Sequence, residues 1–270
     1  LVIPGNGSPS FLACSVMTQT VPAFNPPKAN RQAWLALAVV LAGMFMALID
    51  STVVNVALPS IRTSLNSDES TLSWIVSGYA LTFGLALIPA GRLGDRLGHK
   101  WVFIIGLVLF TIASAYCGIA QNNFDIIVGR LLQGLAAGVY VPAVAAFIQL
   151  LFQGRERGIA FAIWGSTIGG MVALGPVLGG WLATAFDDGW RLAFNVNLPI
   201  GAIILVGLLL FVVESKVQDR HDGIDVLGAL ISVVMFVTLV FGLIEGRTYG
   251  WWLVRSEERR VGKECLRLCR

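Results

Sequence analysis

Long apolar stretches, separated by short polar segments, run through most of the chain. Each stretch is long enough to cross the ~30 Å hydrocarbon core of a bilayer as an α-helix. No alternation of apolar and polar residues, the pattern of a half-buried strand, competes with them. Because the bilayer interior holds no water to pair with backbone N–H and C=O groups, the stretches must be helices. The sequence therefore predicts an all-α polytopic membrane protein with seven spans, at residues 34–56, 72–92, 101–120, 124–148, 158–184, 190–213 and 225–246.

Composition supports a membrane protein and excludes several other classes. Only 13% of the residues are charged and 56% are hydrophobic, whereas a soluble domain has about 25% charged residues. The basic residues are not gathered on one face, so we expect no nucleic-acid partner. His99 and His221 fall in predicted loops and form no metal-binding pattern with the four cysteines, so we expect no metal and no cofactor. The sequence has no G-x-x-x-x-G-K-S/T loop for ATP and no nucleophile–base pair in a span, so we expect no enzyme activity.

Lys and Arg residues near the span ends are unevenly distributed. If the N-terminus is cytoplasmic, nine of them fall on inner segments and three on outer segments. Such an excess on the cytoplasmic side is the positive-inside rule of membrane proteins. The sequence therefore predicts a multi-pass protein of the cell membrane with a cytoplasmic N-terminus. The inner residues are Lys28, Arg31, Arg92, Arg96, Lys100, Arg155, Arg157, Lys216 and Arg220, and the outer ones are Arg62, Arg191 and Arg247.

The two ends of the chain differ from the rest. Residues 1–33 form a polar lead that we expect in the cytoplasm. Within it, residues 1–16 precede Met17 and lack the positively charged start of a signal peptide, so we expect them to be non-native. An odd number of spans places residues 254–270 outside the cell, where their many Lys and Arg residues violate the charge rule. We interpret residues 254–270 as a non-native tail, with a genuine exterior basic tail as the alternative.

Two charged residues, Asp50 and Arg130, lie inside predicted spans. A charge at the centre of a membrane helix costs ~2.5–3.5 kcal/mol on insertion scales, so such residues mark function by default. At 1.5 Å per residue, Asp50 lies about 24 Å from the inner end of its helix and Arg130 about 8 Å from the outer end of its own, at similar depth. One interpretation is that the two charges only neutralise each other in a packed bundle. The other is that Asp50 exchanges a proton during transport, since desolvation disfavours a charged carboxylate. Gln133 shares the helix face of Arg130, as do Gly134 and Gly138, which we expect to serve close packing.

The charged, glycine-rich segment GRLGDRLGHK follows the second span at residues 91–100. Its glycines permit a tight turn and its charges hold it at the cytoplasmic surface, as in any solvated loop. Its order G-x-x-x-D-R-x-G-x-K nevertheless resembles the signature loop between the second and third helices of the major facilitator superfamily. The resemblance implies that a gating loop, which latches the two halves of a transporter together, is formed by Gly91, Asp95, Arg96, Gly98 and Lys100.

Two further motifs extend the resemblance. RLLQG at residues 130–134 resembles the R-x-x-Q-G motif of the fourth helix, whose arginine is implicated in proton transfer. GPVLGG in the fifth span is similar to the G-P-x-x-G-G motif of antiporters within the superfamily; its matching residues are Gly175, Pro176, Gly179 and Gly180. A proline and close glycines kink a helix and let it pack tightly, which would limit leak.

Three segments are similar to the fourteen-helix drug:proton antiporters of that superfamily. They are LIDSTVVNVALP at residues 48–59, FNVNLPIG at residues 194–201, and residues 222–251. The likeness implies the N-terminal six-helix bundle of a major facilitator, built from two inverted three-helix repeats. This domain would cover residues 34–213. A cytoplasmic loop (214–224) and a seventh, linker helix with an exterior end (225–253) would follow.

The resemblance implies the N-terminal half of a proton-coupled multidrug efflux antiporter that exports hydrophobic or cationic small molecules by alternating access. Asp50, Arg130 and Gln133 would couple protons and substrate, with the proton gradient as the energy source. The missing C-terminal half and the lipid bilayer would be its partners. Two alternatives stay open: a major facilitator exporter or symporter of a metabolite, amino acid or siderophore, and a non-transporting membrane scaffold or sensor.

Overall fold

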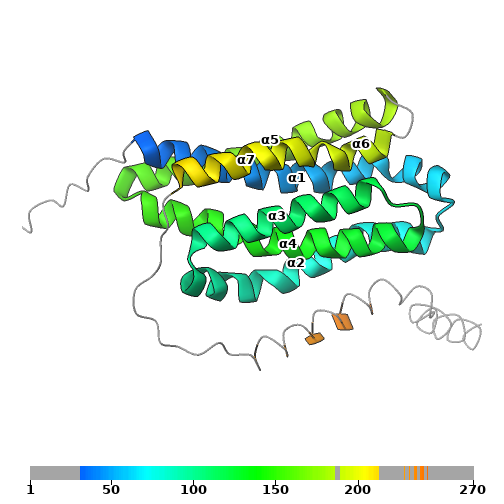
Figure 1. The fold of residues 1–270 in the computed structure, drawn as a ribbon, viewed down its shortest axis with the longest axis horizontal. Helices are drawn as coiled ribbons and strands as arrows, with labels where there is room; N and C mark the ends of the chain where they lie inside the picture. Colours follow the sequence, from blue (N-terminus) through cyan, green and yellow to red (C-terminus); the bar gives the residue numbers. More distant parts are fainter. Residues whose placement is uncertain are drawn as a thin grey trace, which may run out of the picture.

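α-Helices make up the described part of the chain. The structure, a computed structural model, describes residues 31–185 and 189–212 and seven further positions between 228 and 242. Figure 1 shows the helices running side by side along one long axis. They are α1 (Arg31–Leu65), α2 (Glu69–Leu97), α3 (His99–Gly118), α4 (Asn123–Leu151), α5 (Gly154–Ala185), α6 (Gly189–Asn195) and α7 (Asn197–Phe211).

Six helical stretches among the described residues are long and apolar enough to cross a membrane. They coincide with the first six predicted spans, so the all-α polytopic fold is confirmed. Many large apolar side chains point outward: Ile112, Phe124 and Ile203 are 61%, 73% and 72% exposed. Exposed apolar surface on this scale is typical of a protein that faces lipid.

The spans are arranged in two layers of three. In one layer α4 lies between α2 and α3, and in the other α1 lies between α5 and the α6–α7 pair. Contacts of α1 with α4, and of α3 with α6 and α7, join the two layers. The main apolar core includes the buried rings of Phe103, Phe110, Tyr140 and Phe147.

Two glycines bring α4 close to α2. A Cβ at Gly134 would overlap the backbone carbonyl of Tyr79, and a Cβ at Gly138 would overlap that of Phe83. Small residues at such points let membrane helices approach closely. The expected packing role of Gly134 and Gly138 is thus confirmed.

The connection between α2 and α3 is shorter than the predicted loop. α2 continues to Leu97 and α3 begins at His99, so the prediction of a loop over residues 91–100, with His99 in it, is wrong. Gly98 alone reverses the chain, at a φ of 96° that is open to glycine because it lacks a Cβ. The gating motif therefore lies mostly on two helix ends that extend beyond the apolar stretches.

The sixth span is not one continuous helix. It is interrupted at Val196, between α6 and α7, where a single helix over residues 190–213 was expected. Pro199 explains the break, because it has no N–H to donate to the carbonyl of Asn195 and its ring would clash with that carbonyl. In the first turn of α7 the same proline is tolerated, since a backbone N–H at that position would have no partner within the helix anyway.

Side-chain caps mark the starts of α2 and α4. Asp68 Oδ1 accepts a hydrogen bond from the Thr71 N–H at 3.1 Å, and Asn122 Oδ1 accepts one from the Asp125 N–H at 2.9 Å. Caps of this kind satisfy N–H groups that have no partner within the helix. Hydrogen bonds from the Thr71 side chain and backbone favour the ionised form of Asp68 and lower its pKa below the ordinary value.

Several predicted segments lie outside the described residues. These are residues 1–30, the cytoplasmic loop at 214–224 and the tail at 254–270, so the statements made about them remain predictions. In the predicted seventh span, the described positions are helical: Gly228, Ile231, Val234, Met235, Thr238, Leu239 and Gly242.

Candidate functional site

The two charged residues predicted from the sequence meet inside the bundle. Asp50 lies near the middle of α1, and Arg130 lies two turns into α4. Arg130 Nη1 donates to Asp50 Oδ2 in a buried ion pair, and each residue is only 1% exposed. Their predicted similarity of depth is thus confirmed by direct contact.

Three donors hold the Asp50 carboxylate. Arg130 occupies Oδ2, while Oδ1 accepts from Gln133 Nε2 at 3.1 Å and from Asn197 Nδ2 at 3.0 Å. The donors come from α4 and from the first residue of α7. Both carboxylate oxygens of Asp50 therefore accept hydrogen bonds from side chains of other helices.

Arg130 is fixed by further contacts. Its Nε donates to the Ile75 carbonyl at 3.2 Å and its Nη1 to Gln133 Oε1 at 2.9 Å. The guanidinium carbon lies 4.3 Å from the ring centroid of Tyr79 and 5.9 Å from that of Phe194. Cation–π contact of this kind attracts a desolvated cation to the ring face. α2, α4 and α6 therefore all help to position this guanidinium.

Ser114 on α3 completes the polar network. Its Oγ accepts from Gln133 Nε2 at 3.0 Å and from Asn197 Nδ2 at 2.8 Å, and donates to the Phe194 carbonyl at 3.1 Å. Cys117 Sγ donates to Gln133 Oε1 at 3.4 Å. Ser114 was missed from the sequence, and Asn197 was noted only as part of a motif without a role. Uncharged polar residues are common within spans, so no signal in the sequence distinguishes these two.

The network is closed off from its surroundings. Gln133 and Ser114 are fully buried and Asn197 is 1% exposed, like the ion pair itself. In a medium of low dielectric constant, the interactions among these groups are much stronger than in water. Any exchange of a proton at Asp50 therefore requires a change in the packing around it.

The predicted antiporter motif packs on α1 two and three residues beyond this acid. A Cβ at Gly175 would overlap the Thr52 side chain, and a Cβ at Gly179 would lie 3.0 Å from the Val53 Cα. α5 thus approaches α1 within one turn of Asp50. Pro176 is exposed, and a Cβ at Gly180 would have open space around it.

The gating motif lies at the other end of the bundle. His99 packs against Phe147, which is 17 residues beyond Arg130 on α4, or about 25 Å along the helix. His99 is buried, and its Nε2 lies 3.6 Å from Asp95 Oδ1. Gly91 and Arg96 are exposed, and Lys100 is half-buried. The structure therefore does not bring these residues together with Asp50 and Arg130.

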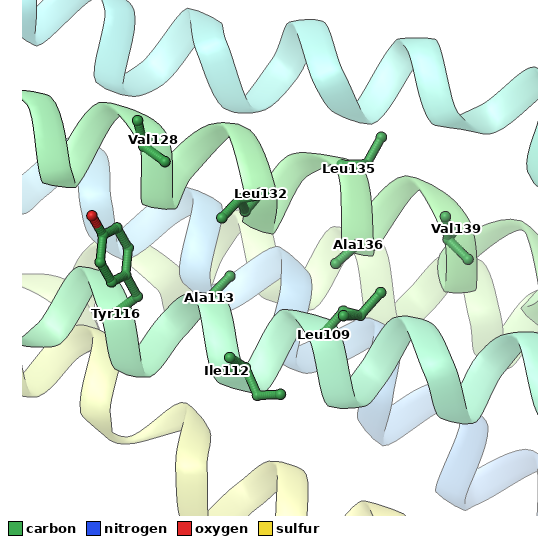
Figure 2. A pocket seen from close by; sticks show the side chains of 9 residues that line it. All are labelled: Leu109, Ile112, Ala113, Tyr116, Val128, Leu132, Leu135, Ala136 and Val139. Atoms are coloured by element: carbon green, nitrogen blue, oxygen red, sulfur yellow. The ribbon is translucent and has the colours of Figure 1, made fainter.

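An apolar groove of about 440 Å³ opens between α3 and α4. Figure 2 shows the side chains that line it, with the Tyr116 hydroxyl at one end. Leu109, Ile112 and Leu132 in its lining are exposed, so the groove faces outward. None of the predicted site residues lines it. The polar network is therefore the better candidate for the functional site.

A comparison with known families decides the wider identity. Residues 40–254 match the Major Facilitator Superfamily. The chain belongs to the major facilitator superfamily. Members of this superfamily are transporters, and with six membrane-capable stretches among the described residues the chain is a multi-pass membrane protein. In those residues no group of three His, Cys, Asp or Glu side chains is placed to hold a metal ion.

Individual relatives of this major facilitator include transport and resistance proteins of Streptomyces. A probable actinorhodin transporter of Streptomyces coelicolor is 39% identical over 228 residues, which cover 84% of this chain and 39% of the relative. The tetracenomycin C resistance and export protein of Streptomyces glaucescens is 34% identical over 83% of this chain and 41% of its own length. The chain thus spans about two fifths of the length of these relatives.

Solved transporters share the fold. A peptide transporter in complex with sulfate has a TM-score of 0.61 at 19% identity, over 78% of this chain and 46% of that one. A bacterial homologue of the lysosomal transporter Spinster has a TM-score of 0.59 at 17% identity, over 74% of this chain and 47% of that one. At such identity the likeness concerns the fold alone.

Proposed function

We propose that the complete protein is a proton-coupled exporter of hydrophobic or cationic small molecules, and that this chain is its N-terminal half, with a cytoplasmic N-terminus. The observation that carries the proposal is the buried pair of Asp50 and Arg130. Burying two charges costs several kcal/mol for each ion, and apolar residues in their place are often as stable or more stable. The presence of the pair inside the membrane spans therefore favours a role in transport over a role in stability. The name of one relative, the tetracenomycin C resistance and export protein, supports the same direction of transport.

A proton on Asp50 changes the electrostatics of the whole network. With Asp50 ionised, Arg130 has a counter-charge; with Asp50 protonated, it keeps only neutral partners, the Ile75 carbonyl, Gln133 Oε1 and the Tyr79 ring. At low dielectric constant, the electrostatic free energy lost with a counter-charge is large enough to shift the equilibrium between two packings of the helices. Proton binding at Asp50 thereby selects between the inward- and outward-open states of alternating access.

The partner in this proposal is a C-terminal half that packs on α5. The exposed face of α5 carries Gly158, Gly165 and Gly169, and a Cβ at any of them would have no neighbour within 4 Å. Small residues of this kind let a second membrane helix approach closely. On its other side, α5 contacts Thr52 and Val53 of α1 through Gly175 and Gly179, so movement of the missing half would reach α1 within one turn of the acid.

The gating motif takes the role of a latch in the same scheme. Asp95, Arg96 and Lys100 lie at the helix ends around Gly98, about 25 Å from the ion pair. They would hold the two halves together on the cytoplasmic side while the Asp50 end is open. The antiporter motif around Pro176 would keep α5 tightly packed and limit leak.

Efflux driven by a pH gradient in inverted vesicles tests the proposal. The complete protein is expected to export a fluorescent cationic drug when the gradient is imposed, and Asp50→Asn is expected to abolish this export. Asp68→Asn removes a carboxylate that lies outside the membrane spans and serves as the matched control, which should retain export. Retained gradient-driven export by Asp50→Asn, at equal protein level, would reject the role of Asp50.

A further inference from the structure

Asn197 carries an unusual buried atom. The residue begins α7, immediately after the break at Val196. Its Nδ2 donates to Asp50 Oδ1 and to Ser114 Oγ, so both amide hydrogens are used. Its Oδ1 is buried without a hydrogen-bond partner among the described residues. Buried polar side-chain atoms are normally paired, and leaving an acceptor unpaired costs about 1–3 kcal/mol.

A protonated Asp50 would need an acceptor that the network does not otherwise supply. Protonation turns one carboxylate oxygen into an O–H donor. Gln133 Oε1 already accepts from Arg130 and Cys117. Ser114 Oγ accepts from both amides and donates to Phe194, so it has no spare lone pair. Among these neighbours, Asn197 Oδ1 is the acceptor with free capacity.

The two amides in the network differ in their freedom to turn. Gln133 is fixed, because turning its amide would point NH₂ at the guanidinium of Arg130 and place two donors face to face. Asn197 has no such constraint, since no donor occupies its oxygen. A half-turn of its amide exchanges Nδ2 and Oδ1 and brings the oxygen to Asp50. An amide can thus donate to the carboxylate in one orientation and accept from the carboxyl group in the other.

We propose that Asn197 is a proton-coupling residue whose side-chain amide turns with the protonation state of Asp50. The inference rests on the proposed function of Asp50. In the ionised state Nδ2 donates to Asp50 Oδ1; when a proton binds there, the amide turns and Oδ1 accepts the new O–H. No covalent bond other than this O–H forms or breaks.

The turn connects the proton to the break in the sixth span. Once Asn197 Oδ1 faces Ser114, the Ser114 hydroxyl can donate to it instead of to the Phe194 carbonyl. That carbonyl lies in the last turn of α6, so its release loosens the α6–α7 junction that Pro199 already interrupts. The binding of one proton thereby alters a backbone hydrogen bond between α3 and α6.

Asp50 is the group that titrates in this scheme. Among the described residues, the other ionisable groups that interact with it are Arg130 and Tyr140 on α4, Tyr79 on α2 and Cys117 on α3. An arginine keeps its proton in proteins, and tyrosine and cysteine are ordinarily neutral near pH 7. α5 approaches α1 here through Gly175 and Gly179, which carry no charge.

Infrared difference spectroscopy of the complete protein across pH tests the proposal. The C=O stretch of protonated Asp50 is identified as the band that Asp50→Asn removes. Asn197→Ala is expected to move this band to higher wavenumber, because the carboxyl O–H loses its acceptor. Asn195→Ala, two residues away in the same junction, should leave the band in place. A band at the same wavenumber in Asn197→Ala would overturn the proposal, even if that variant is less stable.

A second measurement needs no substitution. In the wild-type protein labelled with ¹³C-asparagine, an amide C=O band is expected to change at the same midpoint pH as the Asp50 band. An asparagine band that does not change with pH would overturn the role of Asn197 and leave the proposed function intact. Absence of any Asp50-dependent carboxyl band would instead overturn the proposed function, and this proposal with it.

Discussion

The buried pair of Asp50 and Arg130 allows a quantitative prediction from a double-mutant cycle. Asp50→Asn keeps the shape of the side chain but leaves Arg130 charged and buried, with only neutral acceptors around it. Removing one partner of a buried ion pair typically costs about 3–5 kcal/mol. We expect a loss of unfolding free energy in this range for Asp50→Asn, and a similar loss for Arg130→Gln, which leaves the carboxylate without its counter-charge.

The double variant distinguishes a charge pair from two independent residues. Asp50→Asn/Arg130→Gln leaves no buried charge, so its cost is expected to fall below the sum of the single costs by about 1–3 kcal/mol, the usual coupling of residues in contact. Reversible unfolding of the complete protein in mixed micelles measures all three values. If the loss of unfolding free energy in the double variant equals the sum of the two single losses within about 0.5 kcal/mol, the two residues are not coupled and a buried charge pair is refuted. Gradient-driven efflux should stay absent in the double variant, whatever its stability.

Three further predictions concern backbone positions and one helix cap. Gly134→Ala, whose Cβ would overlap a carbonyl of α2, should lower the unfolding free energy by about 1–3 kcal/mol. Gly84→Ala, whose Cβ would have open space around it, should not lower it. Thermal unfolding in detergent compares the two variants. Gly98→Ala should cost about 1–3 kcal/mol because its φ is 96°, while Gly91→Ala, in helix α2 with no neighbour, should be neutral or stabilising in the same assay. Asp68 has a lowered pKa, so its contribution to stability is complete above its unfolded pKa of about 4 and is lost as pH falls through the folded value. Asp68→Asn, which caps without titrating, should remove this acid-dependent loss of stability below about pH 4.

The ion pair could be predicted from the sequence because charge is scarce within the spans. An apolar helix has a known rise per residue, so counting from its ends gives the depth of Asp50 and Arg130. The count does not give the rotation of each helix, which depends on its packing partners. The contacts of Ser114 and Asn197 with the acid follow from that rotation and could not be predicted from their positions alone.

The ends and breaks of the helices were harder to predict for a different physical reason. Hydropathy indicates where the apolar interior of the membrane ends. A helix continues into water until a residue interrupts its backbone hydrogen bonding. α2 therefore runs past the apolar stretch as far as Leu97, and only Gly98 ends it. The break at Val196 falls inside an apolar stretch, and the signal that marks it is Pro199, which was noted in a motif but not as a helix break.

Proton release on drug binding tests whether the drug and a proton exchange at Asp50. In weakly buffered detergent solution near neutral pH, the complete protein is expected to release protons when a cationic drug is added, because the drug replaces the proton at Asp50. Asp50→Asn should still bind the drug, measured by equilibrium dialysis, but release none. Equal proton release by the wild type and by Asp50→Asn would contradict the exchange of drug and proton at Asp50.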